Sequence, residues 1–400
     1  MKRIIHIFSI VFFMLCCTFV VSCDWENIAS TSENYSNVVS SNKIAKKGVS
    51  VSRYDDGSDK SAMLLEDLGI SWYYNWSAND FANNINAEFV PMIWGEGNVN
   101  TRTLNSIRTG YEQGKYKYLL TFNEPDADTQ GVSSGISVQR ALDLWPQLEK
   151  IGIPLSSPAP TSYSTGWLDE FMEGAIKRNY RVDFIALHCY QNFADENAVA
   201  ELRDELIRIY EKYRRPIWIT EFAAIDIWVW GGHSGNPACT LDAALSYTQN
   251  VTDMLESLGF VERYAWFIDN TNSPTESRLK EAKYTYLYNN DDTISETGEV
   301  YKAQMSSTPL EIVTTLNTGK VGERYRVQLK GSGGSEKYTF SSSAPDGVRE
   351  WSELPDGFSI NSSGVLSGTP HGAGTFDICV SLEDSEQQMT FKYYKLVVEE

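Results

Sequence analysis

The 400-residue sequence is poor in the residues that build disulfide frameworks and metal centres. It holds six cysteines, and three of them lie within the first 23 residues. The other three, Cys189, Cys239 and Cys379, are too few for a disulfide scaffold, although one bridge, such as Cys189 to Cys239, stays open. The four histidines are widely spaced and no CxxC pair occurs, so we expect neither a metal nor another cofactor.

Positive charge is also scarce. Lys and Arg number 34 against 53 Asp and Glu, which gives a net charge of −19 and a pI near 4.7. Long-range attraction to nucleic acid or to an anionic membrane surface is therefore excluded, and we expect no nucleic-acid partner. A neutral polymer stays acceptable as a ligand. The 11 Trp, 22 Tyr and 17 Phe provide rings that suit the apolar faces of sugars as well as a core.

The N-terminus has the pattern of an export signal. Lys2 and Arg3 precede an apolar run over residues 4–21, so residues 1–22 are predicted to be a signal peptide. Val-Val-Ser-Cys at 20–23 resembles a bacterial lipobox, which implies lipidation of Cys23 and an outer-membrane lipoprotein of the cell envelope, open to exposure at the cell surface. An ordinary cleaved signal or a single membrane anchor is the alternative. Residues 23–47, rich in Ser and Asn, predict a flexible tether.

After the tether, short apolar runs alternate with segments in which apolar residues recur at helical spacing. This alternation is typical of a parallel sheet wrapped by helices. Eight runs within about 225 residues match the strand number and size of a TIM barrel, so we predict an α/β fold with a (β/α)8 barrel over residues 48–305. The runs are GVSV from Gly48, SWYYNW from Ser71, EFVPMIW from Glu88, YLLTFNEP from Tyr118, IPLSSPAP from Ile153, DFIALHCY from Asp183, PIWITEF from Pro216 and ERYAWFID from Glu262.

The C-terminal part changes to short alternating segments separated by Gly, Ser and Pro turns, which indicates an all-β domain. The stretch LPDGFSINSSGVLSGTP, from Leu354 to Pro370, resembles the repeat of bacterial immunoglobulin-like domains and precedes a predicted strand over 375–382. We therefore predict a small Ig-like β-sandwich over residues 308–400. No candidate site residue stands out in it, so it is interpreted as a spacer or accessory module.

Two glutamates end apolar runs of the predicted barrel. Glu124 closes the fourth run as TFNEPD, and Glu221 closes the seventh as WITEF. Active sites of such barrels lie at the carboxyl ends of the strands, and a loop salt bridge explains one such carboxylate but not both. Glycosidic cleavage needs one carboxylic acid for the leaving oxygen and one carboxylate for the oxocarbenium-like centre. The pair therefore predicts a glycoside hydrolase.

The motifs, taken in order, resemble glycoside hydrolase family 128, the β-1,3-glucanases, within the clan of retaining barrel glycosidases. The Asn-Glu pair that ends the fourth run and the Glu that ends the seventh carry the likeness to the clan. The likeness to the family covers roughly residues 46–304 and rests on KGVSV, LGISWYYNW, FVPMIWG, LLTFNEPD, LSSPAP, GWLDEF, DFIALHCY, PIWITEF, ERYAWF and YLYNNDDTISETGEVYKA.

The resemblance implies roles for individual residues. Glu124 is the expected acid/base and Glu221 the expected nucleophile. Asn123 is expected to hold the sugar 2-hydroxyl, and Trp266 to stack under the sugar at the cleavage site. The alternatives are structural roles, in which Asn123 only caps a turn and Trp266 only fills space at the top of the barrel.

Other candidates for substrate binding lie at strand ends or in the loops that follow. His188 and Tyr190 close the sixth run and, being two residues apart, point to the same side of their strand, where either can contact Glu221 or a sugar hydroxyl. The remaining candidates are Asn75, Trp76, Trp94 and Trp167.

Together these observations predict a monomeric, retaining endo-β-1,3-glucanase that acts on a β-glucan polysaccharide of the laminarin or curdlan type. Two alternatives stay open. Another β-glycanase of the clan, a β-mannanase or a β-1,4-glucanase, shares the catalytic pair. A non-catalytic surface glycan-binding lipoprotein would be expected to lack one glutamate or its Asn and Trp neighbours, and all four are present.

Overall fold

The structure is a computed structural model. It describes residues 45–52, 60–80, 85–127, 133–227, 235–269, 284–289, 291–304, 310–335, 337–342, 354–385 and 389–400. The predicted signal peptide, the lipidation site Cys23 and most of the predicted tether lie outside the described residues. Among the described residues, no helix has both the length and the apolar character needed to cross a membrane.

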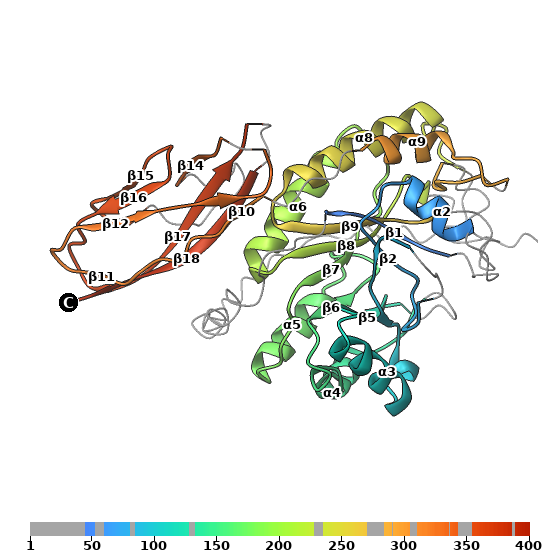
Figure 1. Cartoon of the computed structure of the whole chain (residues 1–400), viewed down its shortest axis with the longest axis horizontal. Helices are drawn as coiled ribbons and strands as arrows, with labels where there is room; N and C mark the ends of the chain where they lie inside the picture. The colour runs from blue at the N-terminus through green and yellow to red at the C-terminus, as the bar shows by residue number, and fades with distance from the viewer. Residues whose placement is uncertain are drawn as a thin grey trace, which may run out of the picture. The chain divides into compact units, whose positions relative to one another are not determined.

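The barrel strands are parallel and follow the eight predicted runs in order (Figure 1). Strand β1 pairs with β2 on one side and with β9 on the other, which joins the first and last strands of the barrel. The strands are β1 (Lys47–Ser50), β2 (Trp72–Tyr74), β3 (Glu88–Phe89), β4 (Met92–Ile93), β5 (Leu119–Asn123), β6 (Leu155–Ala159), β7 (Ile185–His188), β8 (Ile217–Phe222) and β9 (Val261–Trp266). The predicted α/β barrel is therefore confirmed.

The third predicted run is divided into two short strands. β3 pairs with β2, whereas β4 pairs with β5, and Pro91 lies between them. Proline has no backbone N–H to donate, so it interrupts a ladder of hydrogen bonds. One continuous run of sequence thus contributes to two neighbouring pairings.

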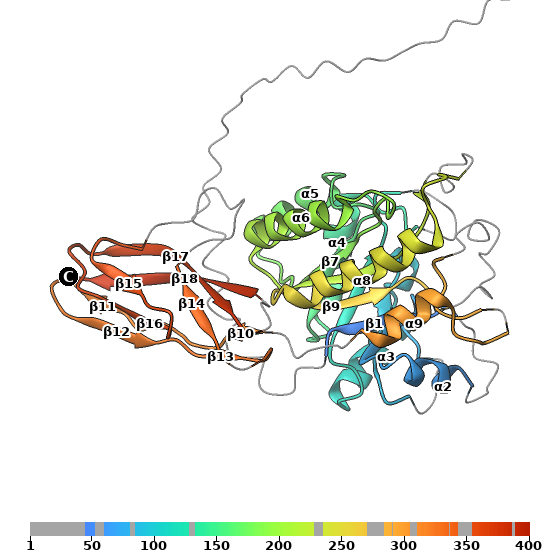
Figure 2. The ribbon, with the colours of Figure 1, turned by 90° about the horizontal axis from the view of Figure 1, so that it is seen from above.

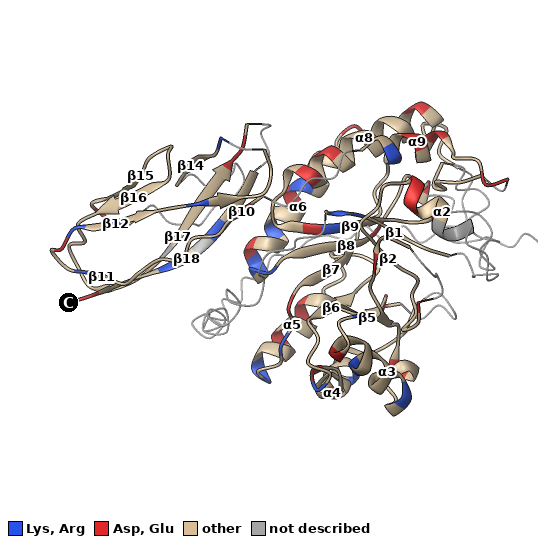
Figure 3. Cartoon of the chain, in the orientation of Figure 1, with Lys and Arg blue, Asp and Glu red and all other residues tan. Residues whose placement is uncertain are grey.

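The helices lie on the outside of the strands, as Figures 1 and 2 show. Several begin at a side chain that caps the first turn, for example Ser137 before α4 and Thr240 before α8. The helices of the barrel are α2 (Lys60–Asp67), α3 (Thr101–Glu112), α4 (Val138–Glu149), α5 (Trp167–Lys177), α6 (Ala198–Tyr213), α8 (Leu241–Ser257) and α9 (Glu296–Ala303). Figure 3 shows acidic and basic residues next to each other on α5 and α6.

Two buried layers hold the barrel together. The larger one packs the outer side of the strands against the helices. The smaller one comprises Trp72, Tyr74, Met92, Leu120 and Trp218, together with their neighbours. Side chains alternate between the two faces of a strand, and these residues therefore belong to the face that the helices do not cover.

A buried ion pair lies next to the smaller layer. The guanidinium of Arg263 lies 4.2 Å from the ring centre of Trp218 and bonds to a carboxylate oxygen of Glu88 at 3.0 Å. Both side chains are nearly inaccessible, at 5% and 7% exposure. The aromatic face and the carboxylate together compensate the cation for its lost hydration.

Two adjacent lysines attach the first strand to the last two helices. The Lys46 ammonium donates to three carbonyl oxygens at the end of α8, those of Leu255, Glu256 and Leu258, at 3.1, 2.7 and 3.0 Å. The Lys47 ammonium donates to three near the end of α9, those of Tyr301, Lys302 and Gln304, at 3.3, 3.3 and 2.8 Å. A cation at the end of a helix satisfies carbonyl groups that the helix itself leaves unbonded.

These contacts correct the predicted end of the tether. Lys46 is 0% exposed and Lys47 is 2% exposed, so both belong to the barrel and not to a flexible segment. Polarity alone assigned them to the tether, because lysine is almost never fully buried unless its charge has partners. The carbonyl groups of distant helices provide those partners.

The C-terminal part is all β, as predicted. Strands β17 (Gly374–Glu383) and β18 (Met389–Glu399) pair along ten residues of β17 and form a four-stranded sheet with β11 and β14. β12, β16 and β15 form a second sheet, and a core of its own includes Phe340, Leu366 and Leu396. The short strands are β10 (Glu311–Ile312), β11 (Gly319–Lys320), β12 (Tyr325–Gln328), β13 (Gly331–Ser332), β14 (Thr339–Ser341), β15 (Phe358–Ile360) and β16 (Val365–Gly368).

Among the described residues, the three cysteines of the folded part form no disulfide bond. Cys189 and Cys379 are buried, and Cys239 is partly exposed. The bridge that the sequence left open between Cys189 and Cys239 is therefore not formed.

We expect the substitution Lys46→Met to lower the free energy of unfolding by about 3 kcal/mol, because three buried carbonyl groups would lose a charged donor. Urea denaturation followed by tryptophan fluorescence measures this value. Lys177→Met is the matched control, since the Lys177 side chain on α5 is 72% exposed, and a change below about 0.5 kcal/mol is expected there. Equal losses in the two variants would contradict the role of Lys46.

Candidate active site

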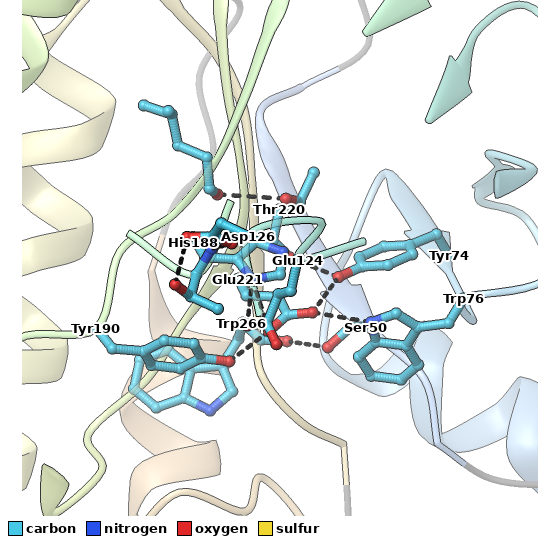
Figure 4. Close-up of polar contacts among 12 residues, drawn as sticks. Ser50, Tyr74, Trp76, Glu124, Asp126, His188, Tyr190, Thr220, Glu221 and Trp266 are labelled. Carbon is cyan, nitrogen blue, oxygen red and sulfur yellow. Dashed lines mark hydrogen bonds and ion pairs between the residues drawn. The ribbon is translucent and has the colours of Figure 1, made fainter. Parts of the chain in front are cut away.

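Glu124 and Glu221 come from strand ends that are far apart in the sequence and close in space. Glu124 follows the last residue of β5. Glu221 is the residue before the last of β8 and pairs with His188 of β7. One oxygen of each carboxylate lies within 4.8 Å of the other. Figure 4 shows the two side chains pointing toward one another, and the parallel strands thus deliver both to one site.

The Glu221 carboxylate is buried and accepts bonds from several donors. It is 4% exposed as a residue. Its Oε1 atom accepts from Trp76 Nε1 at 2.8 Å and from the Tyr74 hydroxyl at 3.3 Å. Its Oε2 atom accepts from the Tyr190 hydroxyl at 2.6 Å and lies 3.3 Å from His188 Nδ1. Such a set of donors favours the ionised carboxylate, which is the form that a nucleophile needs.

Glu124 is held by its backbone more than by its side chain. Its φ of 44° lies in the left-handed region, which non-glycine residues rarely adopt. The amide of Glu124 donates to Ala159 at 2.8 Å. Two residues later, Asp126 accepts from both the amide and the hydroxyl of Thr161 at 2.8 Å, which ties the loop after β5 to the loop after β6. The surroundings therefore fix the strained conformation that aims the carboxyl group.

His188 lies between the two carboxylates. Its Nδ1 atom is 3.0 Å from Oε1 of Glu124 and 3.3 Å from Oε2 of Glu221. Its side chain is 0% exposed, whereas the Glu124 side chain keeps 15% exposure. Of the two catalytic candidates, Glu124 is therefore the more accessible to a ligand.

The electrostatics of the site follow from burial and from these contacts. Burial raises the pKa of the Glu221 carboxyl above its ordinary value, and the charge of Glu124 adds to the rise, whereas His188, Tyr190 and Trp76 oppose it. Burial alone would lower the pKa of His188, but the charges of Glu221 and Glu124 and the hydrogen bond to Glu124 raise it overall.

The two tyrosines that bond to Glu221 stay protonated. Burial and the neighbouring Glu221 charge raise the pKa of Tyr74 and of Tyr190 well above the ordinary value of a phenol. Both hydroxyl groups therefore remain hydrogen-bond donors at neutral pH.

Trp266 does not lie where the resemblance implied. It is 0% exposed, its Nε1 donates to the Thr285 carbonyl at 2.6 Å, and its ring packs on Phe222 and Tyr301 in the layer between strands and helices. A ring without accessible surface cannot stack under a sugar, so the prediction for Trp266 is wrong.

The following residue, Phe267, takes the predicted place. Its ring centre is 5.8 Å from that of Trp76 and 5.8 Å from that of Tyr190, and it is partly exposed. Trp76 and Tyr190 both bond to Glu221. Phe267, the residue after β9, is therefore an aromatic side chain that borders the donors of Glu221.

The other predicted residues divide into two groups. Trp76, His188 and Tyr190 meet at Glu221, whereas the side chains of Asn75, Trp94 and Trp167 have other contacts. Asn75 bonds within its own loop to Asn79 and Ser77, Trp167 donates to Ile136 and stacks on Phe171, and Trp94 packs against the inner layer. Asn123 ends β5 and is 3% exposed. A role of these residues in binding sugar stays a prediction.

Tyr74 is a site residue that sequence reasoning missed. Its hydroxyl donates to the Thr220 carbonyl at 2.9 Å as well as to Glu221. The signal was present, because Trp72 and Tyr74 share one face of β2 and the same spacing of two residues continues to Trp76. The spacing that points to Trp76 therefore points to Tyr74 as well.

Glu124, His188 and Glu221 offer ligand atoms close enough to share one metal ion. Each oxygen of Glu221, however, already accepts a short hydrogen bond from an aromatic side chain, at 2.8 Å from Trp76 and 2.6 Å from Tyr190. A metal ion would have to displace these donors. The cluster is better described as two carboxylates joined by an imidazole, an arrangement suited to proton transfer and nucleophilic attack.

Comparison with known protein families agrees with this geometry. The family model described as "Glycosyl hydrolase catalytic core" matches residues 48–301, and the model described as "Putative Ig domain" matches residues 307–399. The first match covers more than half of the chain and contains every residue of the site.

Individual relatives make the family assignment of this chain more specific. A GH128 subgroup I endo-β-1,3-glucanase from Amycolatopsis mediterranei, solved as a mutant with laminarihexaose, is 36% identical, with a TM-score of 0.54 over 65% of this chain and 99% of its own. Another structure of that enzyme, with laminaritriose, is 37% identical, with a TM-score of 0.53, and the match covers 65% of this chain and 99% of that one.

A second relative is Alkali-sensitive linkage protein 1 of Schizosaccharomyces pombe, which is 29% identical over 238 residues, or 58% of this chain. The match spans only 40% of the length of that protein. The chain belongs to the glycosyl hydrolase catalytic core family, and within it to GH128, the family of the β-1,3-glucanases, with an Ig-like domain after the barrel.

Proposed function

We propose that the protein is a retaining endo-β-1,3-glucanase in which Glu221 is the nucleophile and Glu124 the acid/base. The observation that carries the proposal is the pair of carboxylates at the ends of β5 and β8, one deeply buried among donors and the other more accessible. The buried one is surrounded by His188, Tyr190 and Trp76, which oppose the rise in its pKa that burial causes and so favour its ionised form. The accessible one is placed to reach a glycosidic oxygen.

The reaction proceeds in two steps. In the first, Glu124 gives its proton to the glycosidic oxygen, the bond from C1 to that oxygen breaks, and a Glu221 oxygen bonds to C1. In the second, water attacks C1 while Glu124 takes one of its protons, and the bond from C1 to Glu221 breaks. The donors around Glu221 hold its carboxylate in place for the attack.

The spacing of the carboxylates supports retention of configuration. Retaining enzymes hold the two carboxyl groups about 5 to 5.5 Å apart, whereas inverting enzymes leave about 6.5 to 9.5 Å for a water molecule. In this chain, oxygens of Glu124 and Glu221 lie within 4.8 Å of one another. This upper limit is below the separation that inverting enzymes need, so direct attack by Glu221 is favoured.

The choice of substrate and the endo mode rest on similarity. The solved relative at 36% identity is an endo-β-1,3-glucanase whose complex contains laminarihexaose. We carry both properties over to this chain as part of the proposal. A β-glucan polysaccharide is then its partner, and attachment of the lipid at Cys23 would keep the enzyme at the bacterial outer membrane as a monomer.

A panel of glycans tests the substrate and the mode of action. We expect the purified protein to release oligosaccharides of mixed length from laminarin and curdlan early in the reaction, because an endo-acting enzyme cuts internal bonds. Chromatography of the products from these glucans, barley mixed-linkage glucan, carboxymethylcellulose and mannan provides the measurement.

Each other result of the panel has a defined meaning. One short product from the start would replace endo with exo action. Products only from mannan or carboxymethylcellulose would make the protein a different β-glycanase. Binding without cleavage of any glycan would make it a glycan-binding protein.

Substitution of either catalytic glutamate by glutamine is expected to reduce kcat on laminarin by about 1,000-fold or more, since each removes a group that acts in the transition state. With an activated aryl β-glucoside as the substrate, azide can replace the carboxyl group that the enzyme variant lacks. Glu221→Gly should yield the α-glycosyl azide and Glu124→Ala the β-glycosyl azide, as NMR of the products shows.

The control for these variants is Glu173→Gln, because that side chain is 66% exposed on α5 and is remote in sequence from the site. It should keep full activity. The reverse pattern of azide products would exchange the two roles, and full activity in either glutamine variant would overturn the assignment.

Tyr190→Phe is expected to move the acidic limb of the pH profile of kcat/KM to higher pH by about one unit. The Tyr190 hydroxyl stabilises ionised Glu221, so its loss raises the pKa of that carboxyl. The nucleophile works only when ionised. As the pH is lowered, the variant therefore loses activity at a higher pH than the wild type does. Tyr163→Phe is the control, because Tyr163 bonds to Gln191. Identical limbs in the two variants would rule out this role.

A further inference from the structure

The position of His188 relates to the movement of charge during the reaction, and the inference drawn from it rests on the proposed function. Before the first step the negative charge is on Glu221 and the transferable proton is on Glu124. After that step Glu221 is a neutral ester and Glu124 is the anion. The charge has thus moved from one carboxylate to the other, and the second step moves it back.

One atom of the protein is within hydrogen-bonding distance of both carboxylates. Nδ1 of His188 is 3.0 Å from Oε1 of Glu124 and 3.3 Å from Oε2 of Glu221. Figure 4 shows the imidazole between the two carboxylates. A proton on Nδ1 can therefore bond to whichever group carries the charge, with little movement of the ring.

We propose that His188 is a positioning residue whose Nδ1–H is kept throughout the reaction and is shared between the two carboxylates, so that the same donor stabilises the nucleophile before the first step and the conjugate base of the acid after it. His188 transfers no proton in this cycle. The bond to Oε1 of Glu124 leaves Oε2 as the oxygen that gives and later regains the catalytic proton.

The burial of the ring supports a proton on Nδ1. The other nitrogen, Nε2, is buried and has no hydrogen-bond partner among the described residues. In the neutral ring, a proton on Nε2 would be a buried donor without an acceptor. Nδ1 would then carry no proton and could not donate to either carboxylate. The tautomer with the proton on Nδ1 instead places the donor between two acceptors.

The charged groups around the ring act in the same direction. Glu221 of β8, Glu124 after β5 and Asp126 in the loop that follows all favour a proton on the imidazole. The ring of Tyr190, two residues on, stands edge-on to it at 6.4 Å. Protonation of Nε2 at low pH would give the imidazolium, in which Nδ1 still carries its proton, so the shared donor persists across the working range of pH.

The first test observes Nδ1 without any substrate. The chain has only four histidines, so two-dimensional NMR of the protein labelled with ¹⁵N resolves each ring, and the His188 signals are identified by their absence in a His188→Asn variant. We expect Nδ1 to be protonated at every pH between about 4 and 8, a range that includes the ordinary pKa of histidine. An unprotonated Nδ1, with the proton on Nε2, would overturn the proposal.

The second test compares two substitutions by kinetics on laminarin. Asn has a side-chain nitrogen at the position of Nδ1, so His188→Asn should retain kcat within about tenfold of the wild type, whereas His188→Leu fills the space without a donor and should lose about 100-fold or more in kcat with little change in KM. The acidic limb should move to higher pH only in His188→Leu, because ionised Glu221 loses a donor.

The two tests separate this inference from the proposed function. Equal losses and equal pH profiles for His188→Asn and His188→Leu would show that the ring only fills space. If the wild-type protein cleaves no glycan, the proposed function fails, and the NMR measurement still decides whether Nδ1 carries the proton. Circular dichroism confirms that each variant is folded before it is compared.

Discussion

The site is organised around one constraint, which is that a carboxylate must remain ionised while almost removed from water. Glu221 is 4% exposed, and burial of an anion is unfavourable unless donors replace its hydration. The donors come from two strands and the loops after them. Tyr74 ends β2 and Trp76 follows two residues later, whereas His188 ends β7 and Tyr190 follows two residues later. Rings with polar tips suit this task, because their bodies pack while their tips donate.

Much of this arrangement could be predicted from the sequence, because a parallel barrel converts positions in sequence into positions in space. Polar residues that end apolar runs must gather at one mouth, and this rule selected Glu124 and Glu221. The period of two along a strand placed His188 with Tyr190. The same period, applied to Trp72 and Trp76, would have selected Tyr74 as well.

The period of two fails on β8, where the register shifts, and holds on β9, where it points to a residue other than the one that the family motif indicates. β8 and β9 show register shifts between Ile219 and Phe222. Counting in twos from Trp218, an inner-layer residue, predicts Thr220 on the inner face and Glu221 on the outer one, whereas Glu221 bonds to residues of the site. On β9, Ala265 belongs to the inner layer, so counting from it selects Phe267, not Trp266. The family motif points to Trp266, whereas the local period points to Phe267.

The buried lysines bear on the same geometry. β1 lies between β2, which leads to Trp76, and β9, which leads to Phe267, and these two rings meet beside Glu221. The position of β1 therefore sets the distance between the strands that provide them. Lys46 and Lys47 hold the start of β1 against the ends of α8 and α9, which are close to it only in the folded barrel. The sequence does not reveal such partners, because they are carbonyl groups more than 200 residues away. The closure of the barrel at one end is thus part of what positions the rings at the other.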